Sequence, residues 1–521
     1  MARADPPIAA GSPNGPSAAL PHGLHSLGEL ARAEETLDPH DWDAMRALAH
    51  RMVDDMMSHL ETLRSRGPWQ PIPDAVKARL RADVPLDPSP PESVYDDFRE
   101  CVLPYPYGNF HPRFWGWVNG TGSPLAMMAD MLASGLNPNC AGGEHAATYV
   151  EMQVLDWLRV MMGMPAGSDG LLVSGGSAAN LLGLAAARNR MAAGDVRQAG
   201  VWGLPARMTL YCSSETHHSV RKAAELLGLG AGAVRTVPVD DAYRVRIADL
   251  RSAIQIDRRA GDAPFCIVGN AGTVNTGATD DLDALAELCA EEGLWFHVDG
   301  AFGAFARLSP ALGASVSGVA RADSLAFDLH KWMYLPMDVG CVLFRDGAVP
   351  AASFAVGTSY LAASDRGLLP KMGHFSDRGI ELSRSFRALK AWMSLKAHGT
   401  RTLGRLVEQN VAQAAYLARR VETEPELELL APAPLNVVCF RYRAPDLDDA
   451  ALDDLNVEVL ARLHEQGIAV PSATRLRGRF ALRVAITNHR SRREDFDALV
   501  DAVLRLGRRT AALGFGLSAL G

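Results

Sequence analysis

Lys331 stands between His330 and Trp332 in the otherwise apolar run LAFDLHKWMYLP, residues 325–336. Burying a lysine ammonium is costly unless the charge is paired or removed by chemistry. Alternatively, the side chain extends to the surface and buries only its methylene stem, which is the common fate of lysine. The run alone leaves both interpretations open, so the neighbouring motifs must decide between them.

A second candidate is Asp299, which ends the predicted buried strand in LWFHVDGAFG and precedes Lys331 by 32 residues (331 − 299). Ligands of α/β proteins bind at the carboxyl ends of such strands, so Asp299 is well placed for function. A buried aspartate needs a cation or hydrogen-bond donors to remain ionised. The sequence therefore predicts a partner for both charged groups.

The stretch LLVSGGSAANLLGLAAARNR predicts a strand, a glycine turn and a helix. Gly175 and Gly176 permit a tight turn, and Ser177 falls near the start of the helix. The free N–H groups and the macrodipole at a helix start favour a phosphate, although a simple turn with a serine cap explains the pattern equally well. The motif is neither GxGxxG nor GxxxxGK[ST], so neither a dinucleotide fold nor a P-loop is indicated.

One cofactor meets all three demands. Pyridoxal phosphate has an anionic phosphate for the turn at Ser177, a ring nitrogen that Asp299 can keep protonated, and an aldehyde that condenses with Lys331. A fourth motif, YCSSETHHSVRKAAELLG, predicts a strand, paired histidines and a helix. Its first histidine, His217, could lie over the cofactor ring or simply begin the helix.

These residues need an α/β framework to bring them together. From about residue 120 to 350, short apolar runs alternate with helical patterns, which predicts a mainly parallel sheet. The helix DDLDALAELCAEEG should end at Gly293. Beyond residue 400, NVVCFRYR and RFALRVAI predict strands and REDFDALVDAVLRLG a closing helix.

The predicted organisation has four parts. Residues 1–25 form a flexible tail, 26–118 an N-terminal helical segment, 119–395 the large cofactor-binding α/β domain, and 396–521 a smaller α+β domain. In the second part, HDWDAMRALAHRMVDDMMSHLETLRSR has apolar residues at helical spacing, whereas the proline-rich PWQPIP and VPLDPSPPESVYDDF predict extended connectors.

Composition limits the other possibilities. The 521 residues are 48% hydrophobic and 21% charged, with a formal net charge of −8, which disfavours nucleic acid or an anionic membrane as the main partner. The seven cysteines are scattered singly, which argues against a zinc site or a disulfide framework and favours a cytoplasmic protein. No apolar stretch reaches membrane-spanning length, and the first twenty residues lack the apolar core of a secretory signal.

The chain resembles the group II pyridoxal phosphate-dependent decarboxylases, a family that includes aromatic L-amino acid, glutamate and cysteine sulfinate decarboxylases. The resemblance runs from about residue 95 to the carboxyl end and combines several motifs in order: GGSAANLLGLAAAR, SSETHHSVRKAAE, GNAGTVNTGATDDL, FHVDGAFGAFA, DLHKWMYLP and LSRSFRALKAW. It implies the fold of pyridoxal phosphate-dependent transferases, fold type I.

The resemblance also implies roles for individual residues. Lys331 would form the imine with the cofactor, Asp299 would pair with the ring nitrogen and His217 would stack on the ring. The phosphate contacts would come from Gly176, Ser177 and His330. Thr273 would lie near the cofactor. Several relatives have Asn where this chain has Asp328. Because a carboxylate would repel the phosphate, we expect Asp328 to point elsewhere.

A catalytic loop follows the lysine in the family, and GTSYLAASDRGLLPKMGHFSDRG is similar to it. Tyr360, 29 residues after Lys331 (360 − 331), falls where the decarboxylases carry the tyrosine that protonates the substrate carbon. In the relatives this loop reaches the active site of the neighbouring subunit. The resemblance therefore implies a homodimer with active sites at the subunit interface.

The expected reaction is decarboxylation of an L-amino acid to its amine, with an aromatic substrate favoured. Phe114, Trp115 and Trp117 could line an aromatic pocket or belong to the core. Ser383 falls where some plant aromatic decarboxylases have Gly or Ser, whereas HPRF and the pair Asn119–Gly120 depart from the aromatic branch. The alternatives are an aromatic aldehyde synthase, another fold type I enzyme such as a phosphate-ester lyase or a desulfurase, and a non-enzymatic cofactor-binding protein.

Overall fold

The computed structural model describes residues 36–356, 367–368 and 374–512. The chain divides into two compact units, residues 1–56 and 57–521. In the first unit the described residues lead into α2 (Trp42–Glu61), the helix that the spacing of methionine and leucine predicts. The elements after α2 belong to the second unit, which contains the sheets and the site.

The segment after α2 contains two helices. They are α3 (Asp74–Arg79), which lies between the two predicted extended connectors, and α4 (Pro91–Cys101), which begins inside the second connector and buries Tyr95 and Cys101. The connector prediction is therefore wrong from Pro91 onward. A proline in the first turn of a helix gives up only an N–H that would have no helical partner, so Pro91 starts the helix and does not interrupt it.

Seven strands of the described chain form the large sheet, in the order β2-β8-β7-β6-β5-β3-β4. The pairs among β3 to β7 are parallel, whereas β8 runs antiparallel to both β2 and β7. The sheet is therefore mainly parallel, as predicted. The strands are β2 (Asp169–Val173), β3 (Met208–Ser213), β4 (Val234–Val237), β5 (Ala263–Asn270), β6 (Trp295–Asp299), β7 (Ser324–Asp328) and β8 (Gly340–Phe344).

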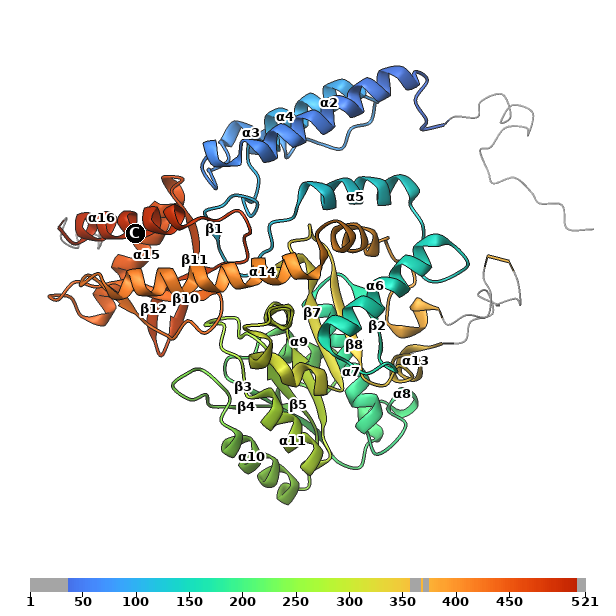
Figure 1. Ribbon diagram of the computed structural model, residues 1–521. Coiled ribbons are helices and arrows are strands. Elements are labelled where there is room, and N and C mark those ends of the chain that lie inside the picture. Colours follow the sequence, from blue (N-terminus) through green and yellow to red (C-terminus); the bar gives the residue numbers. More distant parts are fainter. Residues whose placement is uncertain (1–35, 357–366, 369–373, 513–521) are drawn as a thin grey trace, which may run out of the picture. The chain divides into compact units, whose positions relative to one another are not determined.

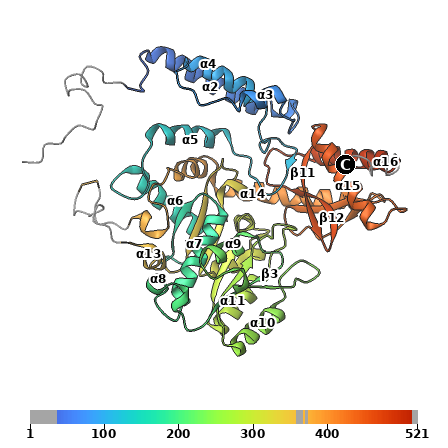
Figure 2. The same cartoon turned by 180° about the vertical axis from the view of Figure 1, so that it is seen from behind.

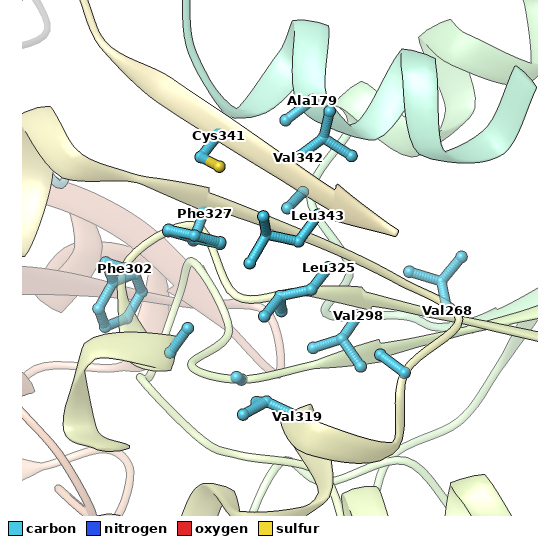
Figure 3. Packing of buried hydrophobic residues seen from close by; sticks show 14 of the residues in the cluster. Ala179, Val268, Val298, Phe302, Val319, Leu325, Phe327, Cys341, Val342 and Leu343 are labelled. Atoms are coloured by element: carbon cyan, nitrogen blue, oxygen red, sulfur yellow. The ribbon is translucent and has the colours of Figure 1, made fainter. Parts of the chain in front are cut away.

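Helices cover both faces of this sheet (Figures 1 and 2). On one face of the sheet, α7 contacts β5 to β8 and packs against α9. On the other face, α10 and α11 contact β3 to β6. Figure 3 shows Ala179 of α7 beside Val342 on one side of the sheet and Val319 on the other. The bounds are α5 (Pro124–Leu136), α6 (Ala146–Met162), α7 (Gly176–Met191), α8 (Val196–Ala199), α9 (Ser219–Leu226), α10 (Ile247–Ala260), α11 (Leu282–Glu292), α12 (Leu329–Trp332) and α13 (Val349–Phe354).

A smaller sheet follows toward the carboxyl end, in the order β1-β11-β12-β10-β9. Its first strand, β1 (Phe114–Trp115), comes from the segment before the large sheet and pairs in parallel with β11. The other elements are α14 (Ala388–Glu422), β9 (Leu427–Leu429), β10 (Val437–Tyr442), α15 (Asp449–Glu465), β11 (Val470–Leu476), β12 (Arg479–Ala485) and α16 (Arg493–Ala512). The predicted domain boundary at 395/396 falls within α14, which contacts α6 as well as β9 and β10.

Across the described residues, no helix has both the length and the apolar character needed to cross a bilayer. All seven cysteines lie in the described residues, and each is buried and free. Burial raises the pKa of these thiols where a shift is resolved, for example to about 11 for Cys212 and about 12 for Cys439. The cysteines are therefore packing residues in the resting protein.

Candidate active site

A cavity of about 490 Å³ lies where three neighbouring parallel strands end. Asn270, Asp299 and Asp328 are the last residues of β5, β6 and β7, and all three line the cavity. Because the strands are parallel, their carboxyl ends meet at one edge of the sheet, where α/β proteins bind ligands. The sequence-predicted residues that line the same cavity are Gly176, Ser177, His217, Asp299, His330 and Lys331.

Lys331 belongs to α12, a single helical turn directly after β7. Its Nζ lies 2.9 Å from Asp328 Oδ2, and the lysine side chain is only 22% exposed. The ammonium therefore does not extend into bulk solvent but faces a buried carboxylate. The expectation that Asp328 points away from the site is wrong, because that argument considered only the phosphate and neglected the lysine as a counter-charge.

The amino end of α7 forms a place for an anion. The 16-residue helix begins at Gly176, and no side chain caps its first N–H groups. A side chain on Gly175 or Gly176 would crowd the site, since a Cβ would lie 3.1 Å from His330 Cε1 or 2.9 Å from Asp328 Oδ2, respectively. The glycines therefore keep the helix start open, where unpaired amides and the macrodipole attract an anionic group.

His330 faces this glycine turn in a defined tautomer. Its Nδ1 accepts a hydrogen bond of 3.2 Å from the amide of Val339, so Nε2 carries the hydrogen. Burial lowers the pKa of His330, which keeps the ring neutral near pH 7. His330 therefore offers one N–H donor toward the start of α7.

Asp299 is buried and receives two hydrogen bonds. The amide of Ala301 donates to Oδ1 at 3.1 Å, and Asn180 Nδ2 donates to Oδ2 at 2.8 Å. The two donors hold the carboxylate in a fixed orientation at the cavity. Asn180 was missed by the sequence analysis, although it follows Ser177 by three residues and so shares that face of the helix.

A chain of hydrogen bonds holds Asn180 in one orientation. The Asp299 carboxylate accepts from the Asn180 NH₂ group, so the amide oxygen faces His297, whose Nε2 donates to it at 2.9 Å. Burial lowers the pKa of His297 to about 4, so the ring remains neutral and its Nδ1 accepts from the Ser324 hydroxyl at 2.8 Å. Trp295 Nε1 in turn donates to Ser324 Oγ at 2.8 Å.

The same amide group also orients His217. Asn180 Nδ2 donates to Ser219 Oγ at 2.9 Å, and His217 Nδ1 lies 2.8 Å from Ser219 Oγ and 3.3 Å from the Ser219 amide. Since the amide can only donate, Nδ1 is an acceptor and the imidazole hydrogen sits on Nε2. Burial lowers the pKa of His217, although the nearby Asp299 raises it.

Of the remaining predicted residues, Thr273 does not line the cavity and Tyr360 is not among the described residues. Gly272 and Val274 line it, but Thr273 between them does not, and its hydroxyl lies 3.1 Å from the hydroxyl of Thr276. Tyr360 lies outside the described residues.

The aromatic residues that were candidates for the substrate pocket differ in whether they line the cavity. Trp117 lines the cavity, whereas Trp115 is buried in the core of the small sheet and stacks on Phe496 at 4.9 Å. Phe114 is buried but does not line the cavity. Ser383 is exposed and is likewise absent from the lining. Of these candidates, Trp117 is the one that lies where a ligand of the cavity can contact it.

The model of the pyridoxal-dependent decarboxylase conserved domain matches residues 73–443. The chain belongs to the pyridoxal-dependent decarboxylase family. A decarboxylase of this family from Bacillus atrophaeus, an aromatic-L-amino-acid decarboxylase, is 33% identical over 87% of this chain and 93% of its own length. A phenylacetaldehyde synthase from Arabidopsis thaliana is 29% identical over 87% of this chain and 93% of the relative.

A solved structure is similar over nearly the whole chain. The crystal structure of Oryza sativa TDC with PLP (pyridoxal phosphate) and tryptamine superposes with a TM-score of 0.83 at 27% identity and covers 91% of this decarboxylase and 99% of the solved chain. The predicted fold type I architecture is thereby confirmed.

The residues around the cavity fit pyridoxal phosphate. The uncapped start of α7 and the His330 N–H can receive the phosphate, Asp299 can face a protonated ring nitrogen, and Lys331 offers the amine. In the described part of the chain, no three His, Cys, Asp or Glu residues are grouped to hold a metal ion. Pyridoxal phosphate is therefore the cofactor of this decarboxylase, and the chain is a carboxy-lyase.

Proposed function

We propose that the substrate is an aromatic L-amino acid, which the enzyme converts to the corresponding amine and carbon dioxide. The observation that supports this substrate class is the lining of the cavity. Trp117 contributes an indole ring, and Lys331 is the only lysine or arginine among the described lining residues. Substrates with a side-chain carboxylate or sulfinate need a further cation, whereas an aromatic ring gains from stacking.

Trp117 is held in a defined position. Its backbone has a φ of 53°, and its carbonyl accepts a hydrogen bond of 2.9 Å from the buried Arg483. The indole stacks on Tyr107, with ring centroids 5.7 Å apart and planes inclined by 21°. A non-glycine residue in the left-handed region stores strain, which other contacts must offset. The arrangement presents the indole as a preformed wall for a flat side chain.

The mechanism assigns one task to each group. When bound, pyridoxal phosphate supplies an aldehyde that condenses with an amine and a ring that takes up the electron pair left when carbon dioxide departs. Asp299 would stabilise a positive ring nitrogen, the start of α7 would hold the phosphate, and Lys331 would supply the amine that attaches the cofactor. His217, neutral and hydrogen-bonded at Nδ1, would cover the ring, and Thr273 would support the segment beside it.

Two further steps concern orientation and protons. With the cofactor bound, the cavity walls would orient the substrate so that the bond to its carboxylate is the one that can break. Tyr360 then donates a proton to the α-carbon of the substrate. This protonation yields the amine and not other products. Lys331 finally displaces the product and restores the resting enzyme.

An aromatic aldehyde synthase is the second candidate, because a relative of similar identity is a phenylacetaldehyde synthase. The two reactions differ in product and in oxygen consumption. The presence of both Tyr360 and His217 favours the amine.

We also propose a homodimer in a reducing cytoplasm. Apolar side chains are exposed on α5 and α6, two helices that both pack against α14: Met131, Leu132, Leu136, Tyr149, Met152 and Val160. Exposed apolar patches mark protein interfaces, and a second copy of the chain would cover these residues. The free cysteines fit a reducing compartment.

The test is an assay of the purified enzyme with pyridoxal phosphate against tyrosine, dopa, phenylalanine, tryptophan, histidine, glutamate and cysteine sulfinate. Amine, carbon dioxide, aldehyde and oxygen are measured together. We expect amine and carbon dioxide from at least one aromatic substrate and no oxygen uptake. Amine from glutamate or cysteine sulfinate alone would exclude the aromatic class, and aldehyde with oxygen uptake would favour the synthase.

Two variants test the roles of individual residues in cofactor attachment and substrate binding. Lys331→Ala should lose the absorbance of the lysine-bound cofactor and the adduct that borohydride traps. Trp117→Ala should raise KM for the aromatic substrate more than it lowers kcat, because the indole contributes binding area. Unchanged kinetics of Trp117→Ala would remove the indole from the substrate site.

A further inference from the structure

Asp328 is the buried carboxylate that the mechanism above does not use. It is the last residue of β7, is 1% exposed, and its amide donates to Ala301 O at 2.9 Å. One carboxylate oxygen, Oδ2, lies 2.9 Å from Lys331 Nζ. The other, Oδ1, is buried without any hydrogen-bond partner. An orphaned oxygen of this kind is costly, so it calls for a functional explanation.

Both carboxylate oxygens of Asp328 face the glycine turn at the start of α7, where the phosphate would bind. A Cβ on Gly176 would lie 2.9 Å from Oδ2, one on Gly340 would lie 2.6 Å from Oδ1, and one on Gly175 would lie 3.7 Å from Oδ1. In the free protein Lys331 is the counter-charge of this carboxylate, which lies beside the positive end of the α7 macrodipole. A phosphate at the same helix start would bring a second negative charge beside it.

The chemistry of Lys331 makes this conflict worse. Only the neutral amine of Lys331 can attack an aldehyde, so its ammonium must first give up a proton. Once the lysine nitrogen is bound to carbon, it carries at most one hydrogen and no longer offers Asp328 a compact ammonium. An ionised Asp328 would then be buried next to the phosphate with a weakened counter-charge.

We propose that Asp328 accepts the proton from Lys331 when the cofactor is attached and then keeps it, donating an O–H to the phosphate. The ammonium transfers one proton to Oδ2, and the freed lone pair forms the C–N bond with the aldehyde carbon. The two hydrogens that remain on nitrogen leave with the aldehyde oxygen as one water molecule. One proton has moved inside the site, and no oxidant or reductant is needed. This inference rests on the proposed role of Lys331.

The other titratable groups at the cavity are less suited than Asp328 to accept the proton of Lys331. Four other titratable side chains face this part of the cavity: His330, His217, Asp299 and Asp338. His330 Nε2 lies 3.7 Å from Asp328 Oδ2 and already carries a hydrogen. His217 Nδ1 and both Asp299 oxygens hold hydrogen bonds to other groups, and Asp338 pairs with Arg387 at 3.3 Å.

The main experiment measures how fast apoenzyme attaches pyridoxal phosphate, by stopped-flow absorbance and borohydride trapping at several pH values. Asp328→Asn keeps the shape and a donor for the phosphate but cannot take the proton. We expect attachment to slow at least about tenfold at neutral pH, within the range for a lost positioned base, and to accelerate with rising pH more steeply than in the wild type. Attachment at the wild-type rate and with the wild-type pH dependence would overturn the proposal.

A second measurement separates the phosphate from the aldehyde. Pyridoxine 5′-phosphate has an alcohol in place of the aldehyde, so Lys331 forms no bond to it and keeps its ion pair with Asp328. We expect Asp328→Asn to bind this ester at least about threefold more tightly than the wild type, because the repulsion is gone. Equal or weaker binding by the variant would contradict the placement of the Asp328 carboxylate beside the phosphate site at the start of α7.

Two controls keep the test interpretable. Asp338→Asn removes a negative charge from the same cavity without touching Lys331, and its attachment rate should follow the wild type. Formate should restore attachment in Asp328→Ala, and a lack of rescue would count against proton transfer. Failure of the wild type to give a trapped adduct on Lys331 would instead refute the role of the lysine, which keeps the two failures apart.

Discussion

The amide nitrogen of Asn180 lies 2.8 Å from Asp299 Oδ2, and the same nitrogen lies 2.9 Å from Ser219 Oγ. One side chain on α7 thus positions both the carboxylate for the ring nitrogen and, through Ser219, the imidazole of His217. On the other side of Asn180, the neutral His297 donates to the amide oxygen, which matches this orientation of the side chain.

Replacement of Asn180 by leucine should therefore weaken cofactor binding without unfolding the protein. Loss of a donor to a buried carboxylate costs about 1–3 kcal/mol, or about 5- to 150-fold in affinity. Titration of apoenzyme with pyridoxal phosphate measures this change. Asn189→Leu on the same helix is the control, because Asn189 contacts the carbonyl of Ser353 away from the cavity. Equal losses in both variants would show that the effect is a general one on α7.

Gly120 should tolerate no side chain. A Cβ there would lie 2.0 Å from His330 O and 2.5 Å from Lys331 O, so even alanine must displace the turn that carries the lysine. We expect Gly120→Ala to lower both the apparent Tm and the yield of borohydride-trapped cofactor. In Gly135→Ala the added carbon meets nothing within 4 Å on α5, and this control should be neutral or stabilising.

The buried pair of Glu151 and Arg384 should behave as a unit. Both side chains are at most 1% exposed, and Arg384 also donates to Leu172 O at 2.8 Å. Arg384→Met leaves Glu151 buried without a cation, which should cost about 3–5 kcal/mol of stability. The double variant Glu151→Leu with Arg384→Met should recover part of that loss. Denaturant midpoints that fall by the sum of the two single effects would disprove the coupling.

Stability should fall as the pH decreases from 6.5 to 4, partly because of His489. Burial lowers the pKa of His489 to about 4, and its Nε2 donates to Gly122 O at 3.2 Å. Between these pH values the unfolded chain binds a proton that the folded chain refuses, so acid favours unfolding, by at most about 3 kcal/mol. His489→Gln should flatten a plot of Tm against pH, and substitution of the exposed His50 should not. A slope unchanged in His489→Gln would rule out this histidine as its source.

The proposed dimer gives a test of Tyr360. If this tyrosine serves the lysine of the other subunit, Lys331→Ala and Tyr360→Phe should complement each other. Co-expression of the two inactive variants should then restore amine formation to about a quarter of the wild-type rate, because half of the dimers are mixed and each has one complete site. Mixed dimers without activity would place both residues in the same subunit.

The sequence by itself was enough to predict the mainly parallel sheet, the turn before α7 and the strand that ends at Asp299. These features depend on local patterns, namely apolar runs, glycines and helix periodicity, which a linear chain displays directly. The group of Lys331, Asp299, Ser177 and His217 could also be anticipated, because each lies at or shortly after the carboxyl end of a strand, and these ends meet at the same edge of the sheet.

Only the tertiary structure decided which polar side chains face one another. Asn180, His297 and Ser324 lie on three different elements, and nothing in their spacing reveals that one directed chain of hydrogen bonds joins them. Asp328 was dismissed from the site on charge alone, yet it faces Lys331 at 2.9 Å. Pairing of buried charges depends on three-dimensional distance and on which partners remain after packing, and sequence separation fixes neither.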